Sequence, residues 1–227
     1  APGGLPPPPG GAGHSPQHVY GPGQGRGPIT LRSSTLLAVM NDVARSLIHH
    51  GFNRIIFVNG HGSNIKVVDP VLRQLRYETG ALIGFVRPYM ERYVGVLEGL
   101  MENPPEETPG WHSSELETSQ DMAWNPSLVR MERAEDTRAH IPDFLPSTFS
   151  KNDGMPDVEF EGYQYFTFPM DHHEFVENGV IGNPLRATPE KGHEALRRYS
   201  EHVAKGVMEL MSVPVKVHTR EFVDRVM

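Results

Sequence analysis

Two short apolar runs on either side of an amphipathic segment constrain the fold of this chain more than any other feature. Residues 54–60 read RIIFVNG and residues 81–89 read ALIGFVRPY. Continuous apolar runs of this length are typical of strands that are buried on both faces of a parallel sheet. Because parallel neighbours need a crossover connection, the segment between the two runs is expected to contain a helix.

Helical spacing of apolar residues precedes each run. The helix predicted within residues 30–50 has Ser33 or Ser34 as its N-cap. A second helix, within residues 64–80, contains Pro70, which either kinks it or marks its true start. The order helix–strand–helix–strand indicates an α/β fold. We predict a single compact layered domain with a mostly parallel sheet flanked by helices.

Later segments carry further signals. Residues 90–103 look helical, and another helix is expected to begin near Ser113. Residues 161–170 (EGYQYFTFPM) have the character of a strand. Thr188 and Pro189 suit the N-cap and first position of a long C-terminal helix.

The first 28 residues are rich in glycine and proline and have no periodicity. Their composition fits either a disordered tail or an ordered loop that borders a site, and histidines interleaved with the glycines suit the loop. We therefore predict a loop segment over residues 1–28, the α/β domain over residues 29–213 and a C-terminal extension over residues 214–227.

Charge and composition exclude several classes of protein. The 227 residues carry a net charge of −7, twelve histidines and no cysteine. No basic stripe is available for nucleic acid, and no apolar run approaches the ~18 residues that cross a bilayer. Without cysteine, any metal ion would be held by histidine and carboxylate. We expect a cytoplasmic protein with neither nucleic-acid nor membrane partners.

The motif NGHGSN, residues 59–64, follows the first predicted strand. In open α/β sheets, ligands bind beyond the carboxyl ends of parallel strands. The glycines on both sides of His61 allow close backbone approach and unusual dihedral angles. The motif indicates either a site around His61 or a glycine-rich turn whose histidine caps the next helix, and its position favours the site.

A second candidate is WHSSELETS, residues 111–119. On a helix that starts near Ser113, His112 and Glu115 would lie three positions apart and share a face. Such a pair can bind one metal ion, or one residue can bind while the other moves a proton. The other interpretation is a helix cap, in which Ser and Glu side chains satisfy free N–H groups.

The segment DHHEF, residues 171–175, contains a dense cluster of possible metal ligands. Adjacent histidines on an extended chain point to opposite sides, so at most one of them could reach a given site. A surface loop is favoured over a metal-binding role for this segment.

Taken in order, GFNRIIFVNGHGSN, WHSSELETS and GVIGNPLRATPEKG resemble the creatininase (creatinine amidohydrolase) family, roughly over residues 10–60, 110–120 and 174–210. The resemblance implies a creatininase-like α/β fold and a metal-dependent amidohydrolase that cleaves a C–N bond in an amide or cyclic amide substrate. It also implies two divalent metal ions (Zn²⁺ and/or Mn²⁺), which would activate a water, and a homo- or hetero-oligomer, commonly a hexamer.

The resemblance assigns a role to each matching position. His61 and Glu115 would be metal ligands, and His112 and Glu115 would be catalytic, with His112 moving the proton at the scissile group. The expected substrate-binding residues are Trp111, His14, His18 and Tyr20. The residues expected to hold the loop are Asn59, Gly60, Gly62 and Asn64.

Two departures from the family pattern affect this assignment. HSSE stands where many members have HAGE, and residues 1–60 contain no match to the family's Glu-x-His-Gly element and following Asp, which supply further ligands. Catalytic zinc takes about three protein ligands, so we expect a complementing N-terminal fragment or chain to complete the site. The alternatives are a non-catalytic structural or regulatory subunit and a hydrolase that opens a cyclic ketone.

Overall fold

The computed structural model describes residues 13–16, 29–87, 95–102 and 112–221. The chain forms two compact units: unit 1 contains residues 1–88 and 206–227, and unit 2 contains residues 89–205. Three predicted substrate-binding residues, His18, Tyr20 and Trp111, lie outside the described residues.

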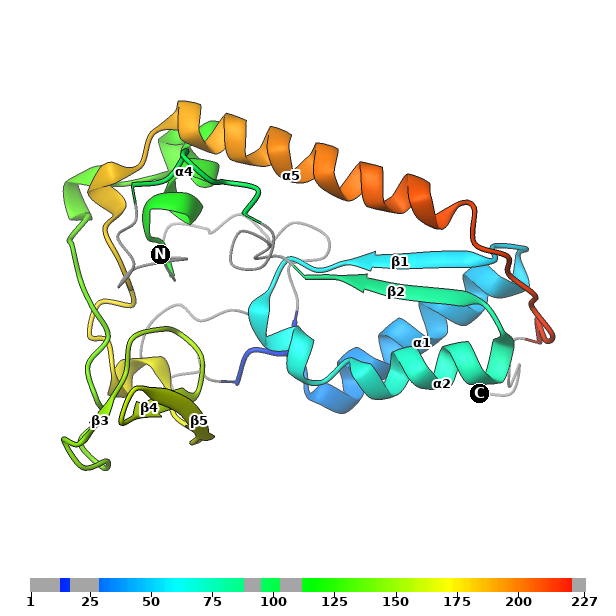
Figure 1. Cartoon of the computed structure of the whole chain (residues 1–227), viewed down its shortest axis with the longest axis horizontal. Helices are drawn as coiled ribbons and strands as arrows, with labels where there is room; N and C mark the ends of the chain where they lie inside the picture. Colours follow the sequence, from blue (N-terminus) through cyan, green and yellow to red (C-terminus); the bar gives the residue numbers. More distant parts are fainter. Residues whose placement is uncertain (1–12, 17–28, 88–94, 103–111, 222–227) are drawn as a thin grey trace, which may run out of the picture. The chain divides into compact units, whose positions relative to one another are not determined.

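Unit 1 contains the predicted alternation of helices and strands. Its elements are α1 (Ser33–His49), β1 (Arg54–Val58), the short 3₁₀ helix η2 (Gly62–Lys66), α2 (Asp69–Thr79) and β2 (Leu82–Val86). β1 and β2 pair in parallel, with Ile56 opposite Gly84. Both helices cover the same face of this pair (Figure 1). The predicted strand–helix–strand crossover is confirmed.

Apolar side chains from the helices and strands form the core of unit 1. They are Met40, Ala44, Ile48, Ile55, Val68, Val71, Leu75 and Ala81. The strands are less buried than expected, since Val58 is 74 % exposed and every residue of β2 is half-buried. The prediction of strands buried on both faces is therefore wrong for the described part of the chain.

Three of the four ends of helices α1 and α2 have the residue that the sequence pattern predicts for a helix start or a helix end. Pro70 lies in the first turn of α2 and so marks its start, and Gly80 ends that helix in the left-handed conformation (φ 77°). Gly51, just after α1, also has a positive φ (102°). The predicted serine N-cap of α1 is wrong, because Arg32 occupies the N-cap position and Ser33 is already helical.

The C-terminal extension is fastened to unit 1. The guanidinium of Arg220 donates to the carbonyl oxygen of Ile48 (2.7 Å). The backbone N–H of His218 donates to the carbonyl oxygen of Thr79 (2.9 Å). Both carbonyls belong to the last turns of helices, where intrahelical partners are missing. Residues 213–221 thus complete the ends of α1 and α2.

Unit 2 has a different architecture. It contains α4 (Glu115–Trp124), the strands β3 (Phe149–Ser150), β4 (Asp157–Phe160) and β5 (Tyr163–Thr167), and the first part of α5 (Pro189–Leu210). Its described residues also form the 3₁₀ turns η3 (Pro126–Leu128), η4 (Met131–Arg133), η5 (His172–Glu174) and η6 (Pro184–Arg186). No described helix is long and apolar enough to span a membrane.

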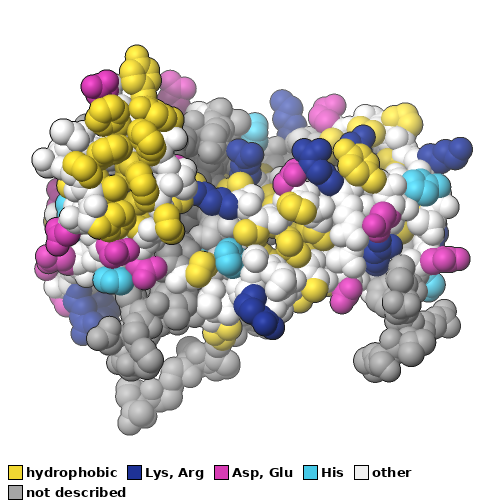
Figure 2. All heavy atoms as spheres, turned by 90° about the horizontal axis from the view of Figure 1, so that it is seen from below, with side chains coloured by type: hydrophobic (Ala, Val, Ile, Leu, Met, Phe, Trp, Pro, Cys, Tyr) yellow, Lys and Arg dark blue, Asp and Glu magenta, His cyan; other side chains and the backbone are white. Residues whose placement is uncertain are grey.

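The three strands of unit 2 form an antiparallel sheet in the order β3-β4-β5. Glu161 and Gly162 join β4 to β5 with positive φ angles (51° and 82°), the geometry of a tight hairpin. Figure 2 shows hydrophobic side chains gathered over this sheet, where Tyr163 and Tyr165 are exposed. The strand predicted within residues 161–170 is confirmed, whereas the antiparallel sheet was not predicted.

The helix predicted over residues 90–103 is not formed where the structure describes it. Residues 95–102 form turns instead, and Gly95 and Gly99 have positive φ angles (62° and 74°). The remainder of this prediction lies outside the described residues.

Gly192 brings α4 and α5 into close contact. A Cβ at this position would lie 1.9 Å from the carbonyl oxygen of Ser119 and 2.8 Å from the Cβ of Ala123. The start of α5 is fixed by Thr188, whose Oγ1 accepts from the backbone N–H of Lys191 (3.2 Å). The predicted N-cap is confirmed, and the next turn of α5 requires glycine.

We predict that Gly192→Ala lowers the free energy of unfolding by about 3 kcal/mol, because the added methyl overlaps backbone that cannot move aside freely. Urea denaturation measures the change. Gly206→Ala is the matched control in the same helix, since a Cβ there meets nothing within 4 Å. Replacing that exposed glycine should stabilise the protein by ~0.5–1 kcal/mol. Equal effects of the two substitutions would contradict the contact.

Candidate active site

The NGHGSN loop is held by hydrogen bonds from its own asparagines. Asn59, which is 7 % exposed, donates from Nδ2 to the carbonyl oxygen of His61 (2.7 Å) and accepts at Oδ1 from Nδ2 of Asn64 (2.9 Å). His61 itself is extended (φ −144°, ψ 129°). Neither Gly60 nor Gly62 has a positive φ, so the expectation that these glycines supply unusual dihedral angles is wrong.

The N-terminal segment reaches this loop through His14. The backbone N–H of His14 donates to Oδ1 of Asn64 (2.9 Å). The ring Nδ1 lies 3.1 Å from the carbonyl oxygen of Leu31, and because a carbonyl only accepts, Nδ1 carries the proton. Unit 1 thus brings His14 beside the loop that contains His61.

His112 lies outside the helix on which it was predicted. α4 begins at Glu115, and both His112 and Ser113 have left-handed backbones (φ 51° and 54°). The expected pairing of His112 and Glu115 on one helical face is therefore wrong. The left-handed conformation is uncommon for residues other than glycine and costs about 1–3 kcal/mol at each position.

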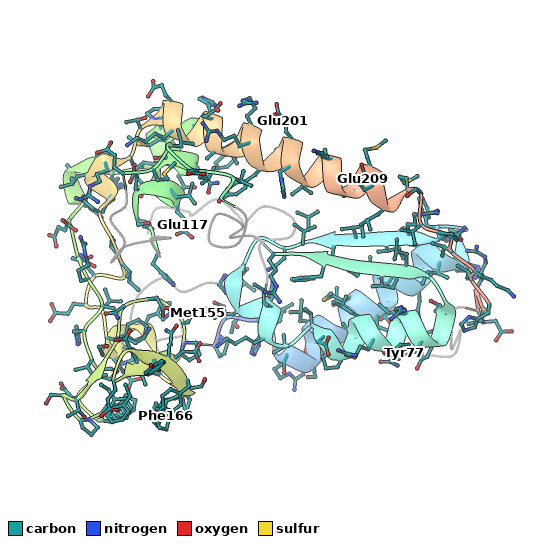
Figure 3. All side chains as sticks on the ribbon, in the orientation of Figure 1. Tyr77, Glu117, Met155, Phe166, Glu201 and Glu209 are labelled. Carbon is teal, nitrogen blue, oxygen red and sulfur yellow. The ribbon has the colours of Figure 1, made fainter. Side chains whose placement is uncertain are left out.

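Neighbouring groups hold this strained backbone in place. The carbonyl oxygen of His112 accepts from the N–H of Ile181 (3.1 Å), which belongs to the GVIGNP motif. The N–H of Ser113 donates to Oε2 of Glu117 (2.7 Å), at the start of α4 (Figure 3). Contacts distant in sequence therefore fix the backbone position of His112.

The carboxylate of Glu115 is completely buried and accepts from two directions. The N–H of Glu102 donates to both of its oxygens (3.0 and 2.9 Å), and Nζ of Lys191 donates to Oε1 (2.6 Å). Lys191 also donates to Oε1 of Glu102 (2.5 Å) and to the carbonyl oxygen of Arg186 (2.8 Å). One ammonium group thus satisfies two carboxylates and a carbonyl.

This cluster shifts the ionisation of its members. Burial lowers the pKa of Lys191, but the hydrogen bonds with Glu102 and Glu115 outweigh burial and leave the pKa above its ordinary value. The hydrogen bond with Lys191 lowers the pKa of Glu102. Both shifts favour the charged forms of Lys191 and Glu102.

The DHHEF segment contains a residue that the sequence prediction missed. His172 is 3 % exposed, and its ring centroid lies 4.0 Å from that of His112. The expectation of a surface loop is wrong for His172, while the neighbouring His173 is exposed. The Asp-x-x-Glu spacing of Asp171 and Glu174 indicates the capping box around the 3₁₀ turn η5 but not the burial of His172.

The candidate metal ligands belong to different units: His61 is in unit 1, and Glu115 is in unit 2. Within the described residues, no three His, Asp or Glu side chains are grouped so that they could hold a metal ion. These residues alone therefore do not supply the roughly three ligands that a catalytic metal takes. The metal-binding roles of His61 and Glu115 remain predictions.

Comparisons with known proteins agree on one protein family. A family model named Creatininase, described as creatinine amidohydrolase, matches residues 5–207. Creatinine amidohydrolase of Pseudomonas putida is 27 % identical over 190 residues, which are 81 % of this chain and 65 % of that protein. The 3-dehydro-scyllo-inosose hydrolase of Thermotoga maritima is 26 % identical over 206 residues, which are 87 % of this chain and 63 % of that protein. The chain thus spans less than two thirds of the length of either relative.

Solved structures agree on the fold. A structure titled "Creatininase Mn" has a TM-score of 0.60 at 26 % identity and covers 89 % of this chain and 74 % of its own. A mutant creatininase of "Zn-Zn type" has a TM-score of 0.59 at 25 % identity, with coverages of 89 % and 73 %. The predicted creatininase-like α/β fold is confirmed.

We predict that Lys191→Met lowers the free energy of unfolding by about 3–5 kcal/mol, because it leaves the buried Glu115 carboxylate without its cation. Adding Glu115→Gln to this variant should restore part of the loss, since a neutral amide is less costly to bury. Urea denaturation of both variants measures the effect. Lys205→Met, on the exposed side of the same helix, is the control and should change nothing measurable. Unaltered stability of Lys191→Met would contradict the ionic role.

Proposed function

The chain belongs to the creatininase family, and on that premise we propose that it is a metal-dependent amidohydrolase that cleaves a C–N bond in a small amide or cyclic amide. The observation that carries this proposal is the family match over residues 5–207. It includes both the NGHGSN loop and the WHSSE element (residues 111–115), which occur in the order expected for this family.

His112 is the proposed proton-transfer residue. An imidazole titrates near neutral pH, so it can both accept and donate a proton at the leaving nitrogen. The ring of His112 is half-buried, and its backbone is fixed by the N–H of Ile181. A partly accessible imidazole on a fixed backbone suits such a step, which requires hydrogen-bond reach to the reacting atom.

The proposed cofactors are two divalent metal ions, Zn²⁺ or Mn²⁺. Related creatininase structures carry both names in their titles. We propose His61 as one ligand and Glu115 as a second. The remaining ligands are proposed to come from a complementing N-terminal fragment or chain, since the family's Glu-x-His-Gly element has no match in residues 1–60. Substrate contact by His14, His18, Tyr20 and Trp111, and assembly into an oligomer, are parts of the same proposal.

A second candidate is hydrolytic opening of a cyclic ketone. The relative from Thermotoga maritima is named for action on an inosose, and its identity to this chain is almost the same as that of the creatinine amidohydrolase. A substrate panel that contains cyclic amides, linear amides and cyclic polyol ketones separates the two reactions.

We predict that the native protein turns over at least one cyclic or linear amide in this panel, and that His112→Ala lowers kcat about 100-fold or more. Metal content should stay unchanged in the variant. His202→Ala, on the exposed side of α5, is the control and should retain full activity. Loss of metal in His112→Ala would show that His112 is a ligand rather than a proton-transfer residue.

We further predict that the native material contains two divalent ions per active site, whereas an expressed chain of only these 227 residues contains fewer. Intact mass and elemental analysis measure both, and chelation should abolish activity until Zn²⁺ or Mn²⁺ is returned. Two tightly bound ions in the 227-residue chain alone would contradict the complementing fragment. A native assembly without metal would favour a non-catalytic subunit.

A further inference from the structure

The ring of His112 rests against a second, more deeply buried histidine. The ring centroids of His112 and His172 are 4.0 Å apart, and the ring planes meet at 75°, an edge-to-face contact. The two residues are far apart in the sequence but lie within the same unit. His172 has no assigned role in the proposed function.

His172 is itself firmly held. Its Nε2 lies 3.2 Å from the carbonyl oxygen of Gly154, so this nitrogen is the donor. Its ring also contacts that of Phe175, with centroids 5.0 Å apart. Its carbonyl oxygen accepts from the N–H of Val176 (2.9 Å), and the capping box of Asp171 and Glu174 closes the turn around it.

The backbone of His112 does not determine the direction of its ring, so packing against neighbouring side chains must do so. The hydrogen bond from Ile181 and the left-handed φ determine where the Cα lies, but the side-chain torsions still allow several staggered positions. A neighbouring ring that cannot move removes some of these positions. For a proton-transfer residue this matters, since a displacement of about 1 Å can lower the rate by about 100-fold.

We propose that His172 is a positioning residue that orients the imidazole of His112 through ring contact. This inference rests on the proposed role of His112 in proton transfer. It predicts that the ring of His172 is the essential feature for turnover, and that the hydrogen bond to Gly154 serves to hold that ring.

Two substitutions separate the ring from the hydrogen bond. His172→Gln can keep a donor near Gly154 but lacks the ring, and His172→Phe keeps a ring but lacks the donor. In the native, metal-containing protein, His172→Gln should lower kcat about 10- to 100-fold with KM changed less than about twofold. His172→Phe should recover most of this loss. His173→Gln, at the exposed neighbouring position, is the control and should behave as wild type.

A measurement without substrate tests the same contact. The ring signals of His112 in a ¹H–¹⁵N NMR spectrum are identified by their absence in His112→Ala. They should move in His172→Gln and stay in place in His173→Gln. Unmoved signals, or recovery of kcat by Gln rather than by Phe, would overturn the inference even if the protein hydrolyses amides. If the wild-type protein turns over no substrate, the proposed function fails, and the ring signals alone decide whether the ring of His172 contacts that of His112.

Discussion

The buried ion pair between Lys191 and Glu115 is the interaction on which unit 2 most depends. A carboxylate with no solvent exposure is tolerated only when a cation and hydrogen-bond donors reach it, and Glu115 obtains these from α5 and from the segment that contains Glu102. Glycine at position 192 lets the two helices approach closely enough for the lysine to arrive. The first turn of α4, and with it the element that carries His112, is therefore tied to the first turn of α5.

That attachment explains how a strained segment persists. His112 and Ser113 both adopt left-handed backbones, which no local preference favours for these residue types. On one side the segment is continuous with the buried start of α4, and on the other it is bound by Ile181 of the GVIGNP motif. Two of the three motifs that resemble the family thus meet in unit 2, since WHSSE is hydrogen-bonded to both Ile181 and Lys191 of GVIGNPLRATPEKG. Strain of this kind is characteristic of functional sites, where the surrounding structure over-determines one conformation.

Elements with local signals could be predicted from the sequence, and contacts across the chain could not. The apolar runs of β1 and β2, Pro70 at the start of α2 and Thr188 at the start of α5 carry their information within a few residues. The conformation of His112 depends on Ile181, and the burial of His172 depends on Gly154 and Phe175. These partners are distant in the sequence or lie beyond a turn, and neither helical nor strand periodicity indicates them. The serine N-cap of α1 was predicted from a local signal and is wrong: Arg32, whose side chain makes no capping hydrogen bond, precedes the first helical residue, Ser33.

The two candidate elements are held by different kinds of chemistry. Around His61, the hydrogen bonds include those of the neutral amides of Asn59 and Asn64 and of the backbone N–H of His14, groups that do not change charge near neutral pH. At the start of α4, support comes from Lys191, which donates to Glu102 and Glu115; the hydrogen bond with Lys191 lowers the pKa of Glu102, and the pKa of Lys191 is raised. A lowered carboxyl pKa gives stability that is present above the unfolded-state pKa and is lost as the pH falls through the folded-state value. Acidification should therefore loosen the WHSSE element, whose support includes the ionised pair of Lys191 and Glu102, while the hydrogen bonds between the amides of Asn59 and Asn64 do not titrate.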